Sequence, residues 1–176
     1  MAFHSDLPAS PWVQRWSTGI RPGGAVLDVA CGAGRHSRLL ARMGFEVDAV
    51  DREPGAFADP PQGVRFAAAD IESGPWPYAG RRFDAIVVTN YLHRPLLDTL
   101  ARSLEPGGLL IYETFARGNE RFGKPSNPDF LLLPGELLEV AARNGLRVLA
   151  YEDLVVEEPR PAAVQRVCAR RESAPS

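Results

Sequence analysis

The chain has 176 residues, of which 45% are hydrophobic and 24% charged, and its net charge is −2 at pH 7. This length and composition fit one globular domain with one core, and the balanced charge disfavours a strongly basic nucleic-acid-binding face. Two distant cysteines form neither a disulfide framework nor a metal site. Neither a signal peptide nor a membrane-spanning run is visible, so we expect a cytoplasmic protein without a membrane partner.

Helices and strands are predicted to alternate along the chain. The first helix starts at Ser10 and Pro11, which are typical of a helix N-cap and first turn. The segment from Arg52 to Gly63 is too rich in proline for the helix that usually joins two parallel strands. Strands are predicted at 25–30, 46–50, 64–69, 83–89, 109–114, 146–156 and 163–169, and further helices at 35–43, 96–104 and 136–143.

The early strands are apolar throughout, which is typical of a parallel sheet covered on both faces. The last two strands are joined by a short turn containing proline, so they should be antiparallel. We therefore predict an α/β fold: a Rossmann-like three-layer sandwich around a mostly parallel seven-stranded sheet, with an antiparallel strand near the edge.

The most informative local feature is the segment 28–34, Asp-Val-Ala-Cys-Gly-Ala-Gly, where a strand becomes a helix. Gly32 and Gly34 permit a tight turn and a close approach of a ligand, and the amides at the helix start favour an anionic group. Taken alone, this loop also fits a tight turn without a ligand. Asp28 is a charged residue at the end of a buried strand, where it needs a partner.

Two further acids end the next two strands. Asp51 is placed to take two ribose hydroxyls, and Asp70 is followed by the apolar Ile71. All three acids should meet at the carboxyl edge of the sheet, where open α/β folds bind ligands. A nicotinamide-dependent oxidoreductase shares the glycine turn, but its motif requires glycine or alanine where Ser37 stands. Asp28 would also repel a pyrophosphate, whereas it would accept a cofactor that carries an ammonium and a sulfonium.

From residue 25 to residue 169 the chain resembles the class I S-adenosylmethionine-dependent methyltransferases. The likeness rests on the 28–34 motif, Asp51, the Asp70–Ile71 pair, Leu-Glu-Pro-Gly-Gly at 104–108 and the order of the elements. Through segment 31–37, the chain is most similar to small bacterial enzymes of the tellurite-resistance and thiopurine methyltransferase-like kind. The resemblance implies S-adenosylmethionine as cofactor and S-adenosylhomocysteine as product.

The same resemblance implies a role for each strand end. Gly32 and Gly34 would pass beneath the methionine part of the cofactor, whose amino group Asp28 would help to hold. Asp51 would take the ribose, and Asp70 the adenine amino group. The implied cofactor-binding set is Asp28, Ala30, Cys31, Gly32, Gly34, Asp51, Arg52, Asp70, Ile71, Asn90 and Tyr91, with the last two beside the methyl group.

Segment 116–133 is long, lacks clear periodicity and follows the fifth strand, so we expect it to form a lid over the acceptor. In this lid, Arg121 and Lys124 would attract an anionic acceptor, and Phe122 and Phe130 would shield the methyl group from water. A solvated surface loop is the alternative.

Methyl transfer from a sulfonium requires in-line positioning, and it requires a base only when the nucleophile carries a proton. The candidates for a catalytic contact are His93, Tyr91 and Glu113, the last of which we place at the end of the fifth strand. His36 lies in the first turn of a helix, where a neutral, structural role is expected. We predict no metal site.

The predicted function is methyl transfer to a small-molecule acceptor by a monomer or homodimer. A single domain over 1–176 would contain an N-terminal lead-in (1–24), a cofactor-binding part (25–115), the lid (116–133), a last helix and strand pair (134–171) and a tail (172–176). The alternatives are an RNA or protein acceptor, a nicotinamide-dependent oxidoreductase, and a non-catalytic binding module.

Overall fold

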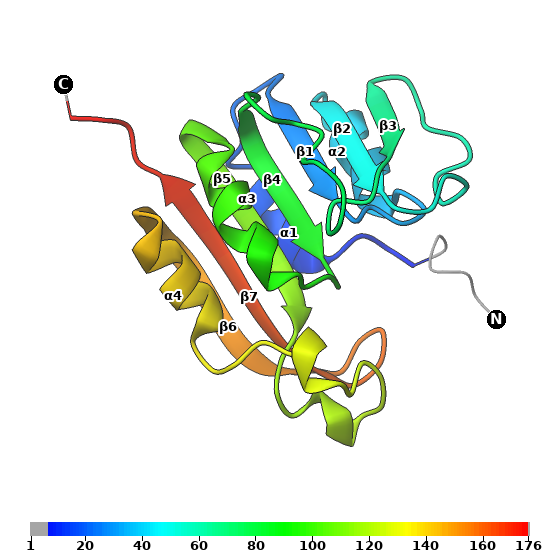
Figure 1. The fold of residues 1–176 in the computed structure, drawn as a ribbon, viewed down its shortest axis with the longest axis vertical. Helices are drawn as coiled ribbons and strands as arrows, with labels where there is room; N and C mark the ends of the chain where they lie inside the picture. Colours follow the sequence, from blue (N-terminus) through cyan, green and yellow to red (C-terminus); the bar gives the residue numbers. More distant parts are fainter. Residues whose placement is uncertain (1–6, 176) are drawn as a thin grey trace.

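A seven-stranded sheet forms the middle layer of the molecule in the computed structural model, which describes residues 7–175 (Figure 1). The spatial order is β3-β2-β1-β4-β5-β7-β6, and β7 runs antiparallel to both of its neighbours. The predicted mixed sheet with one reversed strand is therefore confirmed. The strands are β1 (Ala25–Val29), β2 (Glu46–Asp51), β3 (Val64–Ala68), β4 (Phe83–Thr89), β5 (Leu104–Phe115), β6 (Leu146–Val156) and β7 (Ala162–Arg171).

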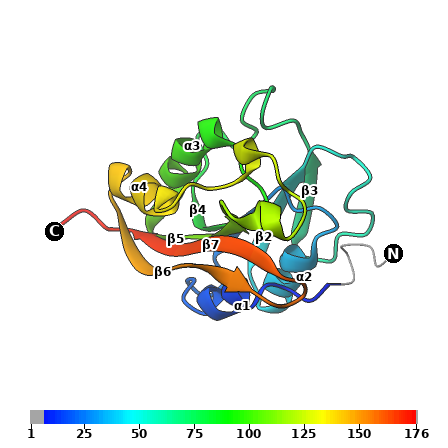
Figure 2. The same ribbon diagram turned by 90° about the horizontal axis from the view of Figure 1, so that it is seen from below.

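Helices cover both faces of this sheet (Figure 2). One face carries α1 (Pro11–Ser17) and α2 (Arg35–Arg42), and the other carries α3 (Leu97–Arg102) and α4 (Glu136–Arg143). Within residues 7–175, three short 3-10 turns lie in the connections: η2 (Arg94–Leu96), η3 (Asn119–Arg121) and η4 (Pro128–Phe130). Among residues 7–175, no helix has the length and hydrophobicity needed to cross a membrane.

Helix α1 begins as predicted. The Ser10 hydroxyl accepts hydrogen bonds from the backbone amides of Trp12 (3.1 Å) and Val13 (3.4 Å), and Pro11 is the first helical residue. This cap satisfies two amides that the helix itself leaves without an acceptor.

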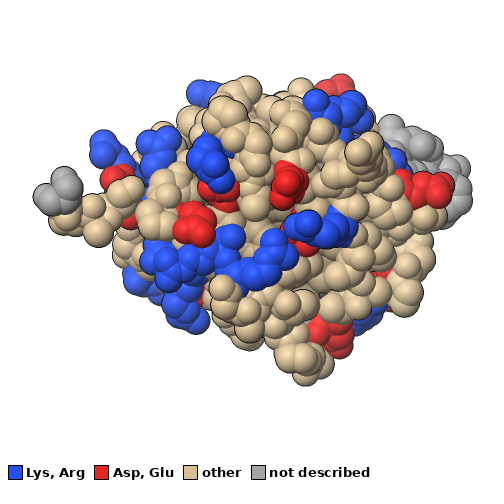
Figure 3. Space-filling model, turned by 90° about the horizontal axis from the view of Figure 1, so that it is seen from above, with Lys and Arg blue, Asp and Glu red and all other residues tan. Residues whose placement is uncertain are grey.

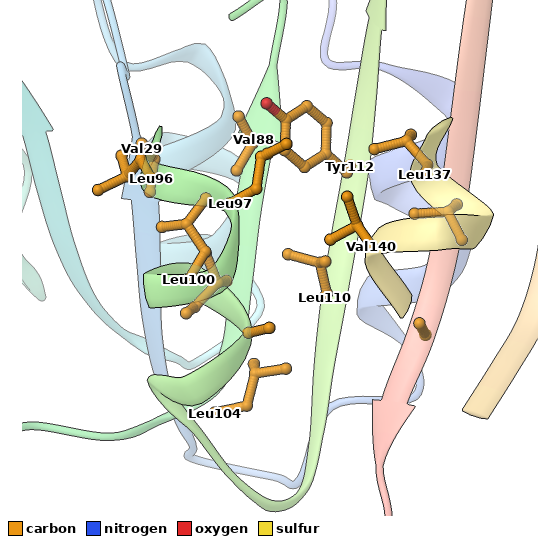
Figure 4. Close-up of a cluster of buried hydrophobic side chains, with 14 of the residues drawn as sticks. Val29, Val88, Leu96, Leu97, Leu100, Leu104, Leu110, Tyr112, Leu137 and Val140 are labelled. Carbon is orange, nitrogen blue, oxygen red and sulfur yellow. The ribbon is translucent and has the colours of Figure 1, made fainter. Parts of the chain in front are cut away.

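The main apolar cluster lies between the sheet and the α3–α4 layer (Figure 4). Val88 and Tyr112 project from β4 and β5 toward Leu100 of α3 and Val140 of α4. Burying one such aliphatic side chain stabilises a fold by about 1.5–3 kcal/mol. A second cluster, between the sheet and α1–α2, completes the three layers.

The fifth strand begins five residues earlier than predicted. Leu104 pairs with Phe83, whereas Leu109 pairs with Ala85, so residues 105–108 bulge out of the sheet. Gly107 has a φ of +83° in this bulge, a conformation that favours glycine. The sequence predicted a helix over 96–104, but α3 ends at Arg102 and the two glycines shape the strand.

The carboxyl ends of the parallel strands meet at one edge of the sheet, the lower one in Figure 1. Segment 116–133 leaves β5 at this edge, as predicted. The connection from β2 to β3 contains no helix, which confirms the prediction for the proline-rich segment. The cofactor loop, the proline-rich segment and the predicted lid therefore all lie at the carboxyl edge.

Candidate cofactor and acceptor site

The glycine loop turns sharply between β1 and α2. Ala30, Gly32 and Gly34 all have positive φ, at 54°, 54° and 87°, and the Gly34 amide donates to the Cys31 carbonyl at 3.0 Å. A Cβ placed on Gly32 would meet no heavy atom within 4 Å. The backbone at Gly32 therefore borders open space, as the close approach of a cofactor requires.

Gly34 is required for a different reason. A Cβ at this position would lie 2.3 Å from the ring of Phe57, which is 2% exposed. Phe57 comes from the proline-rich segment and packs between Gly34, Phe66 (ring centroids 5.9 Å apart) and the Arg38 guanidinium (4.9 Å from the ring centroid). The segment that lacks a helix thus supports the cofactor loop through one aromatic ring, and the sequence analysis did not identify Phe57.

Asp28 is buried beneath the loop, on the α2 side of β1. Its Oδ2 accepts a hydrogen bond from the Ser37 hydroxyl at 2.7 Å, and no ion pair to it forms within residues 7–175. Burial raises the pKa of this carboxyl to about 7. A nearby ammonium group would favour the ionised form, so the site fits a cofactor with a cationic amino group. Ser37 stands where the dinucleotide motif has glycine or alanine, and here it holds Asp28.

Asp51 ends β2 and fastens the glycine loop to it. Its carboxylate accepts from the Gly32 amide (Oδ2, 2.9 Å) and the Glu53 amide (Oδ1, 3.1 Å). A carboxylate has about four acceptor sites, so two remain for ribose hydroxyls. Arg52 is exposed beside Glu53, with 3.9 Å between the charged groups.

Asp70 follows β3 and shapes a tight turn. Its Oδ1 accepts from the amides of Glu72 and Ser73, both at 3.0 Å, and these bonds lower the pKa of the exposed carboxyl. Ile71 packs partly against the main apolar cluster, which fixes the start of the turn. Oδ2 of Asp70 takes part in neither of these backbone bonds and can accept one from an adenine amino group.

Tyr91 and His93 lie beyond the end of β4 and share one acidic partner. The Tyr91 hydroxyl donates to Oε1 of Glu72 at 2.9 Å, and Nδ1 of His93 is 3.9 Å from the same atom. Burial and Glu72 raise the pKa of Tyr91, so its hydroxyl stays protonated at neutral pH. Glu72 was not among the predicted site residues, and its only signal in the sequence is its position two residues after Asp70.

Asn90 directly follows the carboxyl end of β4, just as Ala30 directly follows the carboxyl end of β1. Asn90 has a φ of +53°, is exposed, and its amide donates to the Glu113 carbonyl at 2.9 Å. Asparagine tolerates this left-handed conformation better than most residues. The half-buried thiol of Cys31 has a pKa raised by burial, so it is a neutral part of the loop rather than a nucleophile.

Glu113 is engaged on the α1 side of the sheet. Its oxygens accept from Nη1 of Arg166 and from the Ser10 hydroxyl, both at 2.8 Å. Arg166 also pairs with Glu152 at 2.7 Å and lies 5.1 Å from the Trp12 ring centroid. The strand continues two residues beyond Glu113, to Phe115. The structure therefore does not join Glu113 to the cluster of Tyr91, His93 and Glu72.

His36 is buried at the start of α2. Its Nε2 accepts from the Ser10 amide at 3.0 Å, and its Nδ1 lies 3.3 Å from the Thr89 hydroxyl. Burial lowers the pKa of His36 to about 3, so the ring is neutral. These contacts join the N-terminal segment, α2 and β4, which is a structural role.

The segment 116–133 is fixed at its ends and exposed in its middle. Ala116 bridges Leu132, and the buried Asn119 accepts from the Ala163 amide at 3.1 Å. The four predicted lid residues are all exposed: Arg121, Phe122 (42%), Lys124 and Phe130 (52%). The guanidinium of Arg121 lies 5.3 Å from the Phe122 ring centroid.

Arg94 connects this segment to the end of β4. It donates to Glu136 (2.8 and 2.9 Å) and to the carbonyls of Asp129 and Leu131 (both 2.9 Å). One guanidinium thereby holds η4, the start of α4 and the turn that follows His93. Arg94 was not among the predicted site residues, because its partners are 35–42 residues away in the chain.

Known proteins share both sequence and fold with this chain. Residues 26–108 match the family described as "Methyltransferase domain". A curated relative, the malonyl-[acyl-carrier protein] O-methyltransferase of Serratia marcescens, is 34% identical over an alignment of 104 positions that covers 56% of this chain and 41% of that protein. The chain spans about half the length of the curated relatives it matches.

Solved structures agree with the family match. TehB from Haemophilus influenzae has a TM-score of 0.75 at 21% identity, covering 98% of this chain and 63% of TehB. An S-adenosylmethionine-dependent methyltransferase from Mesorhizobium loti has a TM-score of 0.72 at 18% identity, covering 92% and 96% of the two chains. At such identities the likeness shows the fold.

Together the comparisons agree with the resemblance: residues 26–108 match a methyltransferase domain, and the chain has the fold of these solved methyltransferase structures. The Mesorhizobium protein is named for its dependence on S-adenosylmethionine, the cofactor that the resemblance implied. The comparisons do not test the individual site residues, which remain predictions.

Proposed function

We propose that this protein transfers the methyl group of S-adenosylmethionine to a small-molecule acceptor. A lone pair of the acceptor forms the new bond to carbon, while the sulfur–carbon bond breaks and its electrons stay on sulfur. One observation carries the proposal. At the carboxyl edge of the sheet, the Gly32 backbone borders open space, and its amide donates a hydrogen bond to Oδ2 of Asp51 at 2.9 Å.

The chain's residues would orient the cofactor rather than take part in bond making. Gly32 gives room for the methionine part, Asp51 accepts from ribose hydroxyls, and Asp70 accepts from the adenine amino group. Asn90 and Tyr91 would limit the space around the methyl group. Positioning of this kind supplies up to about 7–11 kcal/mol of the barrier reduction in favourable cases.

The acceptor would enter between the end of β4 and the segment 116–133. Arg121 and Lys124 favour an anionic acceptor, and the exposed rings of Phe122 and Phe130 favour one with an apolar part. The Serratia relative is named for a malonyl group, which carries a carboxylate, and this supports an anionic acceptor. If the nucleophile carries a proton, His93 beside Glu72 is the best placed base.

The test is transfer of labelled methyl from S-adenosylmethionine into a cell extract separated into small molecules, RNA and protein. We expect label in the small-molecule fraction, and at least about a tenfold lower rate with Asp51→Ala, which corresponds to about 1.4 kcal/mol. Asp59→Ala removes an exposed carboxylate from the neighbouring loop and serves as the matched control, with an unchanged rate.

Other outcomes would identify the alternatives. Label in RNA or protein would replace the small-molecule proposal with a macromolecular acceptor. Cofactor binding without label in any fraction would instead indicate a non-catalytic binding module.

A further inference from the structure

A pocket lies at the edge of the sheet opposite the glycine loop. It has a volume of about 370 Å³ and is formed by the turn before β4 and the end of α3. Its wall includes Trp76, Tyr78, Arg81, Arg82, Arg102 and Ser103. Figure 3 shows this face, where the amino ends of the parallel strands lie and where Lys and Arg form an irregular band.

The wall of the pocket is basic and contains no acidic side chain. Arg82 and Arg102 are exposed, and neither forms an ion pair with a carboxylate of residues 7–175. Two guanidinium groups therefore line this region without a salt bridge to the described chain, although Asp98 on α3 lies near enough to Arg102 to feel its charge. Mutual repulsion between such groups is relieved when an anion binds between them.

The third arginine is held rigidly. Nη2 of Arg81 donates to the buried Asp48 at 2.9 Å, and its guanidinium lies 4.8 Å from the Phe83 ring centroid. Asp48 also accepts two bonds from Arg65, so its charge is shared between two cations. Arg81 thus has a fixed orientation and an incompletely neutralised charge, which lowers the entropic cost of binding an anion.

Trp76 and Tyr78 of this wall also carry hydrogen-bond donors that lie beneath the surface and lack an acceptor among the described residues. The indole Nε1 of Trp76 and the hydroxyl of Tyr78 are buried, and neither has a partner within residues 7–175. Tyr78 is 5% exposed and its ring packs edge-on against Trp76, with 5.4 Å between ring centroids. Buried polar groups nearly always find a partner, so two orphaned donors beside a basic pocket are unusual.

We propose that this pocket binds the phosphate group of a small molecule, independently of methyl transfer at the other edge. Guanidinium groups match the geometry of phosphate oxygens and bind them in pairs of hydrogen bonds. A nucleic-acid backbone fits less well, because acids such as Asp84 and Glu105 lie along the same edge and the chain is acidic overall. The pocket also has the size of a small ligand rather than of an extended groove.

The experiment uses the full chain labelled with ¹⁵N and sodium pyrophosphate as the probe. Sodium chloride keeps the ionic strength constant during the titration. Each of the three tryptophans gives an indole signal, and Trp76→Phe assigns that of Trp76. We expect a saturable shift of the Trp76 signal, whereas Trp12, whose indole already bonds to the Val167 carbonyl, should not respond.

Three variants make the result specific. Arg82→Gln and Arg102→Gln should each raise the Kd at least about tenfold, because a charge-assisted bond contributes about 1.5–3 kcal/mol. Arg42→Gln removes the same charge from an exposed site at the end of α2 and should leave the Kd unchanged. All three side chains are exposed, and superimposable spectra would establish that each variant folds.

Several results would overturn the proposal. These are the absence of a Trp76 shift, a shift that does not saturate, or equal weakening in all three variants. Tighter binding of a single-stranded oligonucleotide with a steep salt dependence would show a nucleic-acid face instead.

Discussion

Alanine at Gly34 should destabilise the fold much more than alanine at Gly32, although both glycines have positive φ. The left-handed conformation costs a residue with a Cβ about 1–2 kcal/mol at either position. At Gly34 the new Cβ would also lie 2.3 Å from the Phe57 ring, and relieving such overpacking costs about 1–3 kcal/mol more. Urea unfolding should therefore show losses of about 2–5 kcal/mol for Gly34→Ala and about 1–2 kcal/mol for Gly32→Ala.

A double-mutant cycle with Phe57→Ala isolates the ring contact. Removing the ring costs about 3–5 kcal/mol by itself, but it also removes the clash. Gly34→Ala combined with Phe57→Ala should therefore be less destabilised than the sum of the single variants by about 1–3 kcal/mol. Additive losses, or equal losses for the two glycine variants, would refute the packing argument.

The remaining predictions concern acids and the segment 116–133. Because burial raises the folded-state pKa of Asp28 to about 7, the folded protein retains a proton that the unfolded chain loses near pH 4. The free energy of unfolding should therefore fall between pH 4 and pH 7, by at most about 4 kcal/mol, and denaturation of Asp28→Asn across this range should show a smaller fall. Asp51→Asn should weaken S-adenosylhomocysteine binding in calorimetry, because the neutral amide accepts less strongly from the Gly32 amide and from ribose; unchanged affinity would mean that the ribose contact is misplaced. Arg94→Gln should speed hydrogen exchange in residues 127–133 and slow methyl transfer while cofactor affinity stays constant; a loss of cofactor affinity would contradict its assignment to the acceptor side.

Local sequence signals predicted most of the fold. The N-cap at Ser10, the apolar strands and the turn between β6 and β7 depend on residues that are neighbours in the chain. The positions of Asp28, Asp51 and Asp70 followed from strand ends alone, because parallel strands place their carboxyl ends together.

Contacts over long sequence distances could not be predicted in this way. Phe57 supports Gly34 from a segment with no periodicity. Glu72 reaches Tyr91 although their strands, β3 and β4, are separated in the sheet by β2 and β1. Glu113 looked like a free acid at a strand end, but the antiparallel β7 brings Arg166 directly opposite it.

The most direct test of the central claim is calorimetric titration of the unmodified protein with S-adenosylhomocysteine and, separately, with NAD. We predict saturable binding of S-adenosylhomocysteine and no binding of NAD. At an S-adenosylhomocysteine concentration of a hundred times the Kd, the free energy of unfolding should rise by about 2.7 kcal/mol. Binding of NAD without binding of S-adenosylhomocysteine would contradict the assignment of the Asp28–Gly34 loop as a methyltransferase cofactor site.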